Sequence, residues 1–191
     1  MTNKPQSFVR PLLDYIDNGN FFRAPFRILY LVIAVASALV PFLALYGIID
    51  SGVFKFAEAG MIIGIVLAWL VMLAGFLVVA VIWWTRADQL RDLAPSGDEY
   101  PVTPVFVHFL RTSGESGGVI VGGVMFLVLL IMLIFAGSQG GSLLSSVPGL
   151  AGGSWATVFM MPVIGFLIVL FSRFLSEQIR ALVNIAQNTK K

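Results

Sequence analysis

The chain has 191 residues, of which 58% are hydrophobic and 12% are charged. Soluble proteins carry about 25% charged residues, so this composition excludes an ordinary soluble domain and predicts an integral membrane protein. The formal net charge of +2 comes from Lys and Arg residues spread along the chain, which argues against nucleic-acid binding, and the absence of Cys excludes disulfides and thiol chemistry.

Residues 1–27 are predicted to form a cytoplasmic amphipathic segment. Apolar residues recur there at spacings that suit one face of a helix: Phe8, Val9, Leu12 and Ile16. Such a helix is expected to lie in the membrane interface ahead of the first span. A helix packed against other protein is the alternative.

Residues 28–93 are predicted to form a first transmembrane hairpin. Its spans, 28–49 and 60–84, carry no charged side chain, and a helix of about 20 residues crosses a hydrocarbon core of about 30 Å. The second span begins with a small residue at every fourth position: Gly60, Gly64 and Ala68. This ridge is either a face on which another helix packs closely or a merely permissive feature of a glycine-rich helix.

Residues 94–116 are predicted to be a cytoplasmic linker. Turn residues at Pro95-Ser-Gly97 are followed by apolar residues at helical spacing: Val102, Val105, Phe106, Phe109 and Leu110. The linker is therefore expected to contain a second interfacial helix, which leads into the third span.

Residues 117–182 are predicted to form a second hairpin, with spans at 117–136 and 155–172, and residues 183–191 a cytoplasmic tail. No charged side chain occurs from Ser116 to Ser172. The strongest helix-packing signal in the chain is the glycine ridge of Gly114, Gly118 and Gly122. Gly118→Leu is therefore expected to destabilise the protein more than Leu129→Ala, if Leu129 faces lipid.

The end of the fourth helix carries an apolar stripe that has no evident partner. It consists of Phe171, Leu175, Ile179, Leu182 and Ala186, and it extends beyond the expected end of the span. The stripe indicates self-association or a partner protein.

The distribution of Lys and Arg predicts the orientation. Eleven of the 12 lie in the N-terminal segment, the central segment or the C-terminal tail, and only Lys55 lies between the spans of a hairpin. The positive-inside rule then predicts that both termini and the central segment are cytoplasmic.

The two hairpins resemble each other in sequence. Gly75-Phe-Leu precedes Asp88-Gln-x-Arg91, and Gly165-Phe-Leu precedes Glu177-Gln-x-Arg180. We interpret this as a tandem duplication, which would give two hairpins of equal orientation. The alternative is chance similarity, since apolar helices resemble one another by composition.

Charged residues near the hairpin ends are the candidate site. They are Asp88, Arg91, Arg173, Glu177 and Arg180, and they are expected to meet at the cytoplasmic rim as structural ion pairs or, alternatively, as a gating or docking site. The single His108 is expected to be interfacial or buried. No catalytic, cofactor-binding or metal-ligating residues are predicted.

Short motifs resemble a group of small bacterial membrane proteins that carry only a domain-of-unknown-function label. They are Phe21-Phe22-x-x-Pro25, Arg173-x-x-x-Glu177 and Ile185-Ala-x-Asn188. The resemblance covers the hairpin ends, and Arg91 and Asp92 of the first hairpin do not restore the full pattern. It implies a small helical protein of the bacterial inner membrane and no site residues.

The sequence therefore predicts an all-α integral membrane protein without enzymatic activity. The expected role is a structural or accessory subunit of a homo-oligomer or a larger membrane complex, in contact with the lipid bilayer. The alternative is an oligomeric channel lined by small or apolar residues. A membrane enzyme ranks third, because its catalytic groups would all have to come from the cytoplasmic rim.

Overall fold

The computed structural model describes residues 20–90, 102–145 and 154–189, and all its regular elements there are helical. Four stretches are long and apolar enough to cross a membrane: Arg23–Asp50, Ala59–Gln89, Thr103–Gly137 and Trp155–Thr189. This confirms the prediction of an all-α protein with four candidate spans. The proposed N-terminal interfacial helix falls largely outside the described residues.

In chain order, the described elements are α2 (Asn20–Asp50), the 3₁₀-helix η1 (Val53–Lys55), α3 (Ala59–Gln89), α4 (Thr103–Gly118), the π-helix η2 (Val119–Met125), α5 (Phe126–Ser145) and α6 (Trp155–Thr189). Within α5 the backbone is kinked at Gly137, whose φ of 51° is one that glycine adopts without strain.

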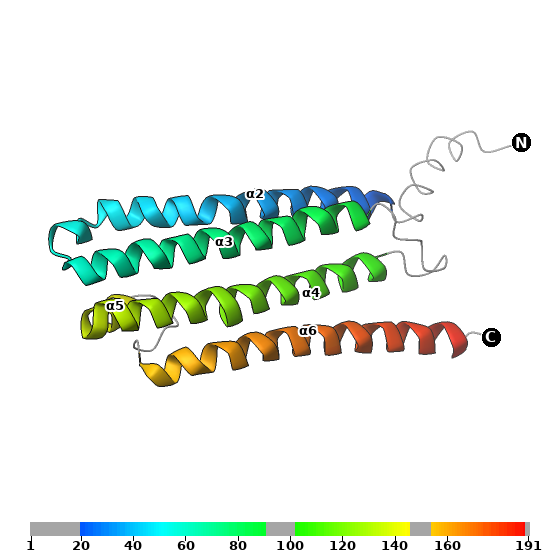
Figure 1. Cartoon of the computed structure of the whole chain (residues 1–191). Coiled ribbons are helices and arrows are strands. Elements are labelled where there is room, and N and C mark those ends of the chain that lie inside the picture. Colours follow the sequence, from blue (N-terminus) through cyan, green and yellow to red (C-terminus); the bar gives the residue numbers. More distant parts are fainter. Residues whose placement is uncertain (1–19, 91–101, 146–153, 190–191) are drawn as a thin grey trace, which may run out of the picture.

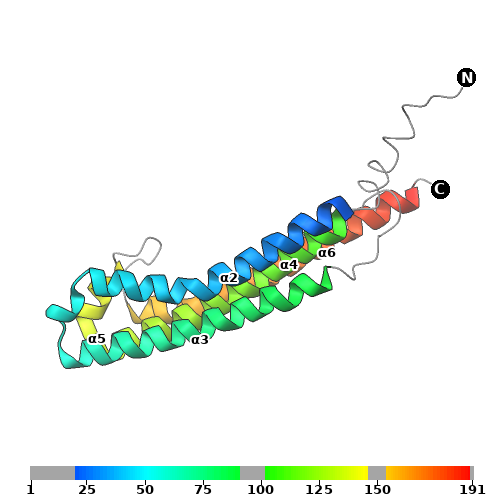
Figure 2. The ribbon, with the colours of Figure 1, turned by 90° about the horizontal axis from the view of Figure 1, so that it is seen from above.

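The four long helices run alternately up and down, and the start of α2 and the end of α6 lie at the same end of the bundle (Figure 1). We call this the terminal end, and the opposite end the loop end. Seen after a turn of 90°, α2 and α3 lie side by side, with α4 and α6 behind them (Figure 2). The helices therefore form a bundle rather than a flat row.

Residues 103–116 continue into the third span without a break. They belong to α4, which passes through η2 into α5, so the candidate span starts at Thr103. Their location in the membrane interface stays a prediction. From Thr103 onward no Pro after the first turn interrupts the helix, so the polar residues near 111–116 stay helical.

The third span changes its neighbour along its length. Its first part, α4 and η2, packs mainly against α6, whereas α5 packs mainly against α3. The change occurs at the π-helical segment. An i→i+5 turn holds more residues than an α turn, so the side chains that follow are rotated relative to those before it.

Two apolar clusters form the core. The cluster at the loop end joins α3, α5 and α6 through Met61, Ile65, Ala68, Leu129, Met132, Val158 and Met161. Leu129 is 0% exposed. The expectation that Leu129 faces lipid is therefore wrong, and Leu129→Ala would open a cavity rather than act as a neutral control.

The cluster at the terminal end joins α2, α3 and α4. It is rich in aromatic contacts: the Tyr30 and Trp83 rings lie 4.7 Å apart and edge to face, and Phe26 and Phe109 lie 5.7 Å apart in the same arrangement. Edge-to-face pairs of this kind stabilise a contact beyond the area they bury.

Close helix contacts occur at the predicted glycine ridges, and they lie within the chain. A Cβ on Gly60 would meet the carbonyl oxygen of Phe135 at 2.8 Å, and one on Gly122 would meet the Cα of Gly165 at 3.2 Å. Gly64 also faces Phe135, Ala68 is buried in the loop-end cluster, and Gly114 and Gly118 face Ser172 and Val169 of α6.

Two further glycines, which lie outside the predicted ridges, belong to this packing. Gly75 of α3 faces Val124, and Gly165 of α6 faces Gly122, so both lie against η2. They are the glycines of the repeated Gly-Phe-Leu motif. The repeated motif therefore marks two glycines that pack against another helix.

Candidate functional site: a polar chain at the terminal end

Polar side chains connect all four long helices at the terminal end. Tyr30 Oη of α2 lies 2.9 Å from His108 Nδ1 of α4, and His108 Nε2 lies 3.4 Å from Gln89 Oε1 of α3. A neutral imidazole protonated on Nε2 satisfies both contacts, because Tyr30 then donates to Nδ1 and Nε2–H donates to Gln89. His108 is thus a partly buried structural side chain.

The series of polar contacts continues from Gln89 through Arg86 to Glu115. Arg86 Nη1 donates to Gln89 Oε1 at 3.1 Å, and Arg86 Nη2 donates to Glu115 Oε2 at 2.8 Å. The other carboxylate oxygen, Oε1, accepts from Arg111 Nε at 3.2 Å and from Arg173 Nη2 at 3.3 Å. One carboxylate therefore binds guanidinium groups from α3, α4 and α6.

Glu115 is the centre of this arrangement, and only 17% of its side chain is exposed. Charge-assisted hydrogen bonds are stronger than neutral ones, and partial burial reduces their screening by solvent. The carboxylate links the first hairpin to the second, since Arg86 belongs to α3 and Arg173 to α6.

Small residues beside Glu115 let α4 and α6 pack closely. Gly114 lets Ser172 of α6 approach, and the hydroxyl groups there donate to carbonyls of their own helices. Thr112 donates to His108, Ser116 to Thr112, Ser172 to Val169 and Ser176 to Ser172. The α4–α6 contact therefore buries hydroxyls without leaving them unpaired.

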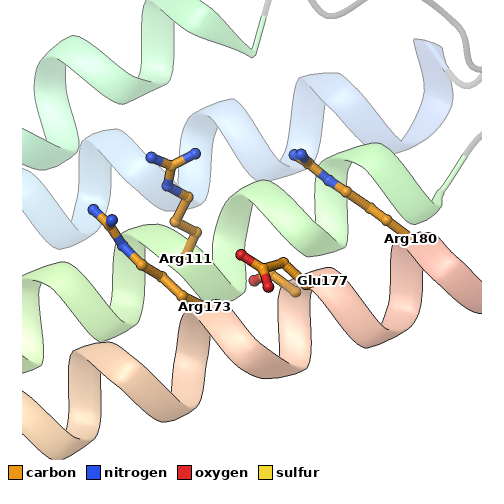
Figure 3. Close-up of a pocket in the computed structure, with 5 residues that line it drawn as sticks. Arg111, Arg173, Glu177 and Arg180 are labelled. Atoms are coloured by element: carbon orange, nitrogen blue, oxygen red, sulfur yellow. The ribbon is translucent and has the colours of Figure 1, made fainter.

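Next to Glu115 lies an open-sided pocket between α4 and α6, of about 110 Å³. We call it the α4–α6 pocket. Figure 3 shows Arg111 of α4 and Arg173 and Arg180 of α6 extending to the same side, with the Glu177 carboxylate between Arg173 and Arg180. The pocket is lined by Arg111, Arg173, Ser176, Glu177 and Arg180.

The predicted rim residues meet only in part. Arg173, Glu177 and Arg180 share the α4–α6 pocket. Asp88 lies apart, 3.7 Å from Arg27 of α2, and its side chain is 70% exposed. Arg91 lies outside the described residues.

Glu115, the residue that connects the most helices, was not among the predicted site residues. A local signal was available, because Arg111 and Glu115 are four residues apart and so share one face if the segment is helical. The assignment of residues 94–116 to a linker hid that signal. The pairing with Arg86 and Arg173 depends on helix packing and has no sequence signature.

Arginine side chains supply most of the described charged groups at the terminal end. Among the described residues no three His, Cys, Asp or Glu side chains come together. Arginines in a fixed arrangement bind carboxylate or phosphate oxygens, often with two parallel hydrogen bonds. The site can therefore hold an internal carboxylate, as it does with Glu115, or an external anion.

The chain was also compared with known proteins. Family profiles, curated proteins and solved structures all give no match.

Proposed function

We propose that this protein is a non-enzymatic four-span protein of the bacterial inner membrane that acts as a structural or accessory subunit, assembling with itself or with a larger complex. The observation that carries the proposal is the terminal end of α6. Leu182 is 64% exposed and Ile185 is 59% exposed there. Both residues lie beyond the arginines of the α4–α6 pocket along the helix.

The helix α6 is longer than the hydrocarbon core is thick, which places these two exposed side chains relative to the membrane. Leu182 lies about 40 Å along the helix from Trp155, and the hydrocarbon core measures only about 30 Å. With Trp155 at the opposite interface, Leu182 and Ile185 would lie outside the lipid core. Apolar side chains in that position favour a protein partner.

The glycine ridges do not support assembly, because their close contacts are with helices of the same chain. They account instead for the tight packing of a single bundle. The case for a partner therefore rests on α6. Its packing is chiefly with the third span, which leaves the opposite face of α6 open along its whole length.

A channel within one chain is not favoured. The two apolar clusters fill the interior of the bundle at both ends. A pore lined by small or apolar residues would have to form between copies of the chain.

The orientation and the duplication complete the proposal. With the positive-inside rule, the arginines at the terminal end favour cytoplasmic termini. The proposed duplication is supported by the repeated sequence motifs and not by the glycine contacts, because Gly75 faces Val124 of the other hairpin whereas Gly165 faces Gly122 of its own hairpin.

The orientation can be tested with single cysteines, since the chain has none of its own. Lys55→Cys and Asn188→Cys both replace exposed residues, at the loop end and the terminal end. We expect a membrane-impermeant maleimide to label Lys55→Cys in intact spheroplasts and to label Asn188→Cys only after the membrane is opened. The reverse pattern would place the termini outside.

Assembly through α6 can be tested by substitution. Leu182→Ala with Ile185→Ala should shift the protein toward monomer, or release a co-purifying partner, in native mass spectrometry from mild detergent. The matched control is Leu167→Ala with Leu170→Ala, which removes apolar side chains that are each 52% exposed within the span. The control should keep the wild-type assembly. A wild-type protein that is strictly monomeric, without any partner, would contradict the proposal.

A further inference from the structure

The α4–α6 pocket carries an excess of positive charge and many unused hydrogen-bond donors. Three of its five lining residues are arginines and one is a glutamate. Arg111 uses Nε and Arg173 uses Nη2 to bind Glu115, which leaves most of the five N–H groups of each guanidinium available. Arg180 forms no ion pair with any described residue.

We propose that this pocket binds the phosphate group of an anionic phospholipid. Guanidinium groups match phosphate oxygens in geometry and charge. Basic pockets between transmembrane helices are suited to lipid headgroups of this kind. Ser176 does not contribute a proton to the phosphate, because its hydroxyl donates to the carbonyl of Ser172 at 2.7 Å.

The depth of the pocket favours a lipid over a free anion. Along α6, Arg173 lies about 27 Å from Trp155, and Arg180 lies about 38 Å from it. If Trp155 marks one interface, Arg173 lies near the opposite edge of a core of about 30 Å and Arg180 lies beyond it, so the pocket is at the level of the opposite headgroups.

A path for acyl chains leads away from the pocket. Phe166 is 66% exposed and Leu170 is 52% exposed. Phe166 and Leu170 are four residues apart, and Arg173 and Glu177 follow after three and four more, so all four lie on one face of α6 with the apolar pair nearer the centre of the span. A lipid whose phosphate contacts the arginines can lay its chains along these side chains, which a soluble phosphate cannot use.

Glu177 provides an internal test, because its carboxylate opposes an anion in the pocket. The full-length protein, stripped of lipid in mild detergent, is titrated with phosphatidylglycerol or phosphatidylcholine, and bound lipid is counted per chain by native mass spectrometry. We expect phosphatidylglycerol to bind more tightly. Arg180→Gln should weaken its binding about fivefold, the factor that corresponds to about 1 kcal/mol for one basic residue at an anionic surface. Glu177→Gln should strengthen it by a similar factor.

The charge-matched control is Arg27→Gln, which removes one arginine at the same end but outside the pocket. It should leave phosphatidylglycerol binding unchanged. Equal binding of the two lipids, or equal weakening by Arg27→Gln and Arg180→Gln, would overturn the proposal. Inorganic phosphate provides the second arm: if it displaces phosphatidylglycerol at equimolar concentration, the pocket is a site for a soluble anion and the lipid assignment is wrong.

These outcomes do not depend on the proposed assembly, since lipid is counted per chain whatever the oligomeric state. Arg180 and Glu177 are exposed and form no ion pair with described residues, so neither substitution should alter the fold. Unchanged thermal midpoints of the two variants in lipid-free detergent would establish this. A lowered midpoint for Arg180→Gln would overturn the assignment of Arg180 as a free ligand.

Discussion

Gly165→Ala is expected to destabilise the protein by about 2 kcal/mol, within the usual range for overpacking a tight core. A Cβ at this position would overlap the Cα and backbone nitrogen of Gly122 and would meet the carbonyl oxygen of Gly118 at 3.0 Å. These are backbone atoms of the neighbouring helix, so no side-chain rotation relieves the overlap. The two helices must separate, and lipid does not replace the packing they lose.

Reversible unfolding in mixed micelles would measure this effect, with Gly123→Ala as the matched control. Gly123 lies beside Gly122 in η2, and a Cβ there would have no atom within 4 Å. Gly123→Ala should therefore change stability by less than about 0.5 kcal/mol, as usual for substitutions away from packed features. Gly118→Ala should fall between the two, because its added Cβ mainly meets a methyl group of Val169, which can move. Equal stabilities for Gly165→Ala and Gly123→Ala would contradict the close crossing.

Glu115→Gln is expected to cost about 2 kcal/mol of stability. Breaking a buried ion pair costs about 3 to 5 kcal/mol, and the arginines here are partly exposed, which lowers the figure. The substitution removes the charge that holds Arg86, Arg111 and Arg173 together at distances of 2.8 to 3.3 Å. The three guanidinium groups then repel one another across α3, α4 and α6, so the terminal end should loosen first.

Hydrogen exchange would locate this loosening, and Asp88→Asn is its control. Asp88 is also an acid at the terminal end, but it is 70% exposed and lies 3.7 Å from a single arginine. Exposed pairs contribute about 0 to 1 kcal/mol, so Asp88→Asn should leave exchange in α4 and α6 unchanged. If Asp88→Asn had the larger effect, Glu115 would not be the residue that joins the two hairpins.

The sequence by itself determined the number and type of the main elements. Four long runs without charged side chains have the length of spanning helices, and a helix is stable in lipid because it satisfies its backbone groups within its own segment. The small-residue ridges were also readable, because their four-residue spacing is a local property of a helix. Their contact partners were not, since a ridge can face the same chain or another one.

The terminal end shows what only the tertiary structure decided. The sequence predicted that Asp88 and Glu177 meet at the cytoplasmic rim, but Asp88 pairs with Arg27 and the central acid is Glu115. Which arginine reaches which carboxylate depends on the rotation of each helix about its axis. That rotation is set by packing, here by the contacts of Gly165 with Gly122 and of Gly114 with Ser172, which fix how α4 and α6 face each other.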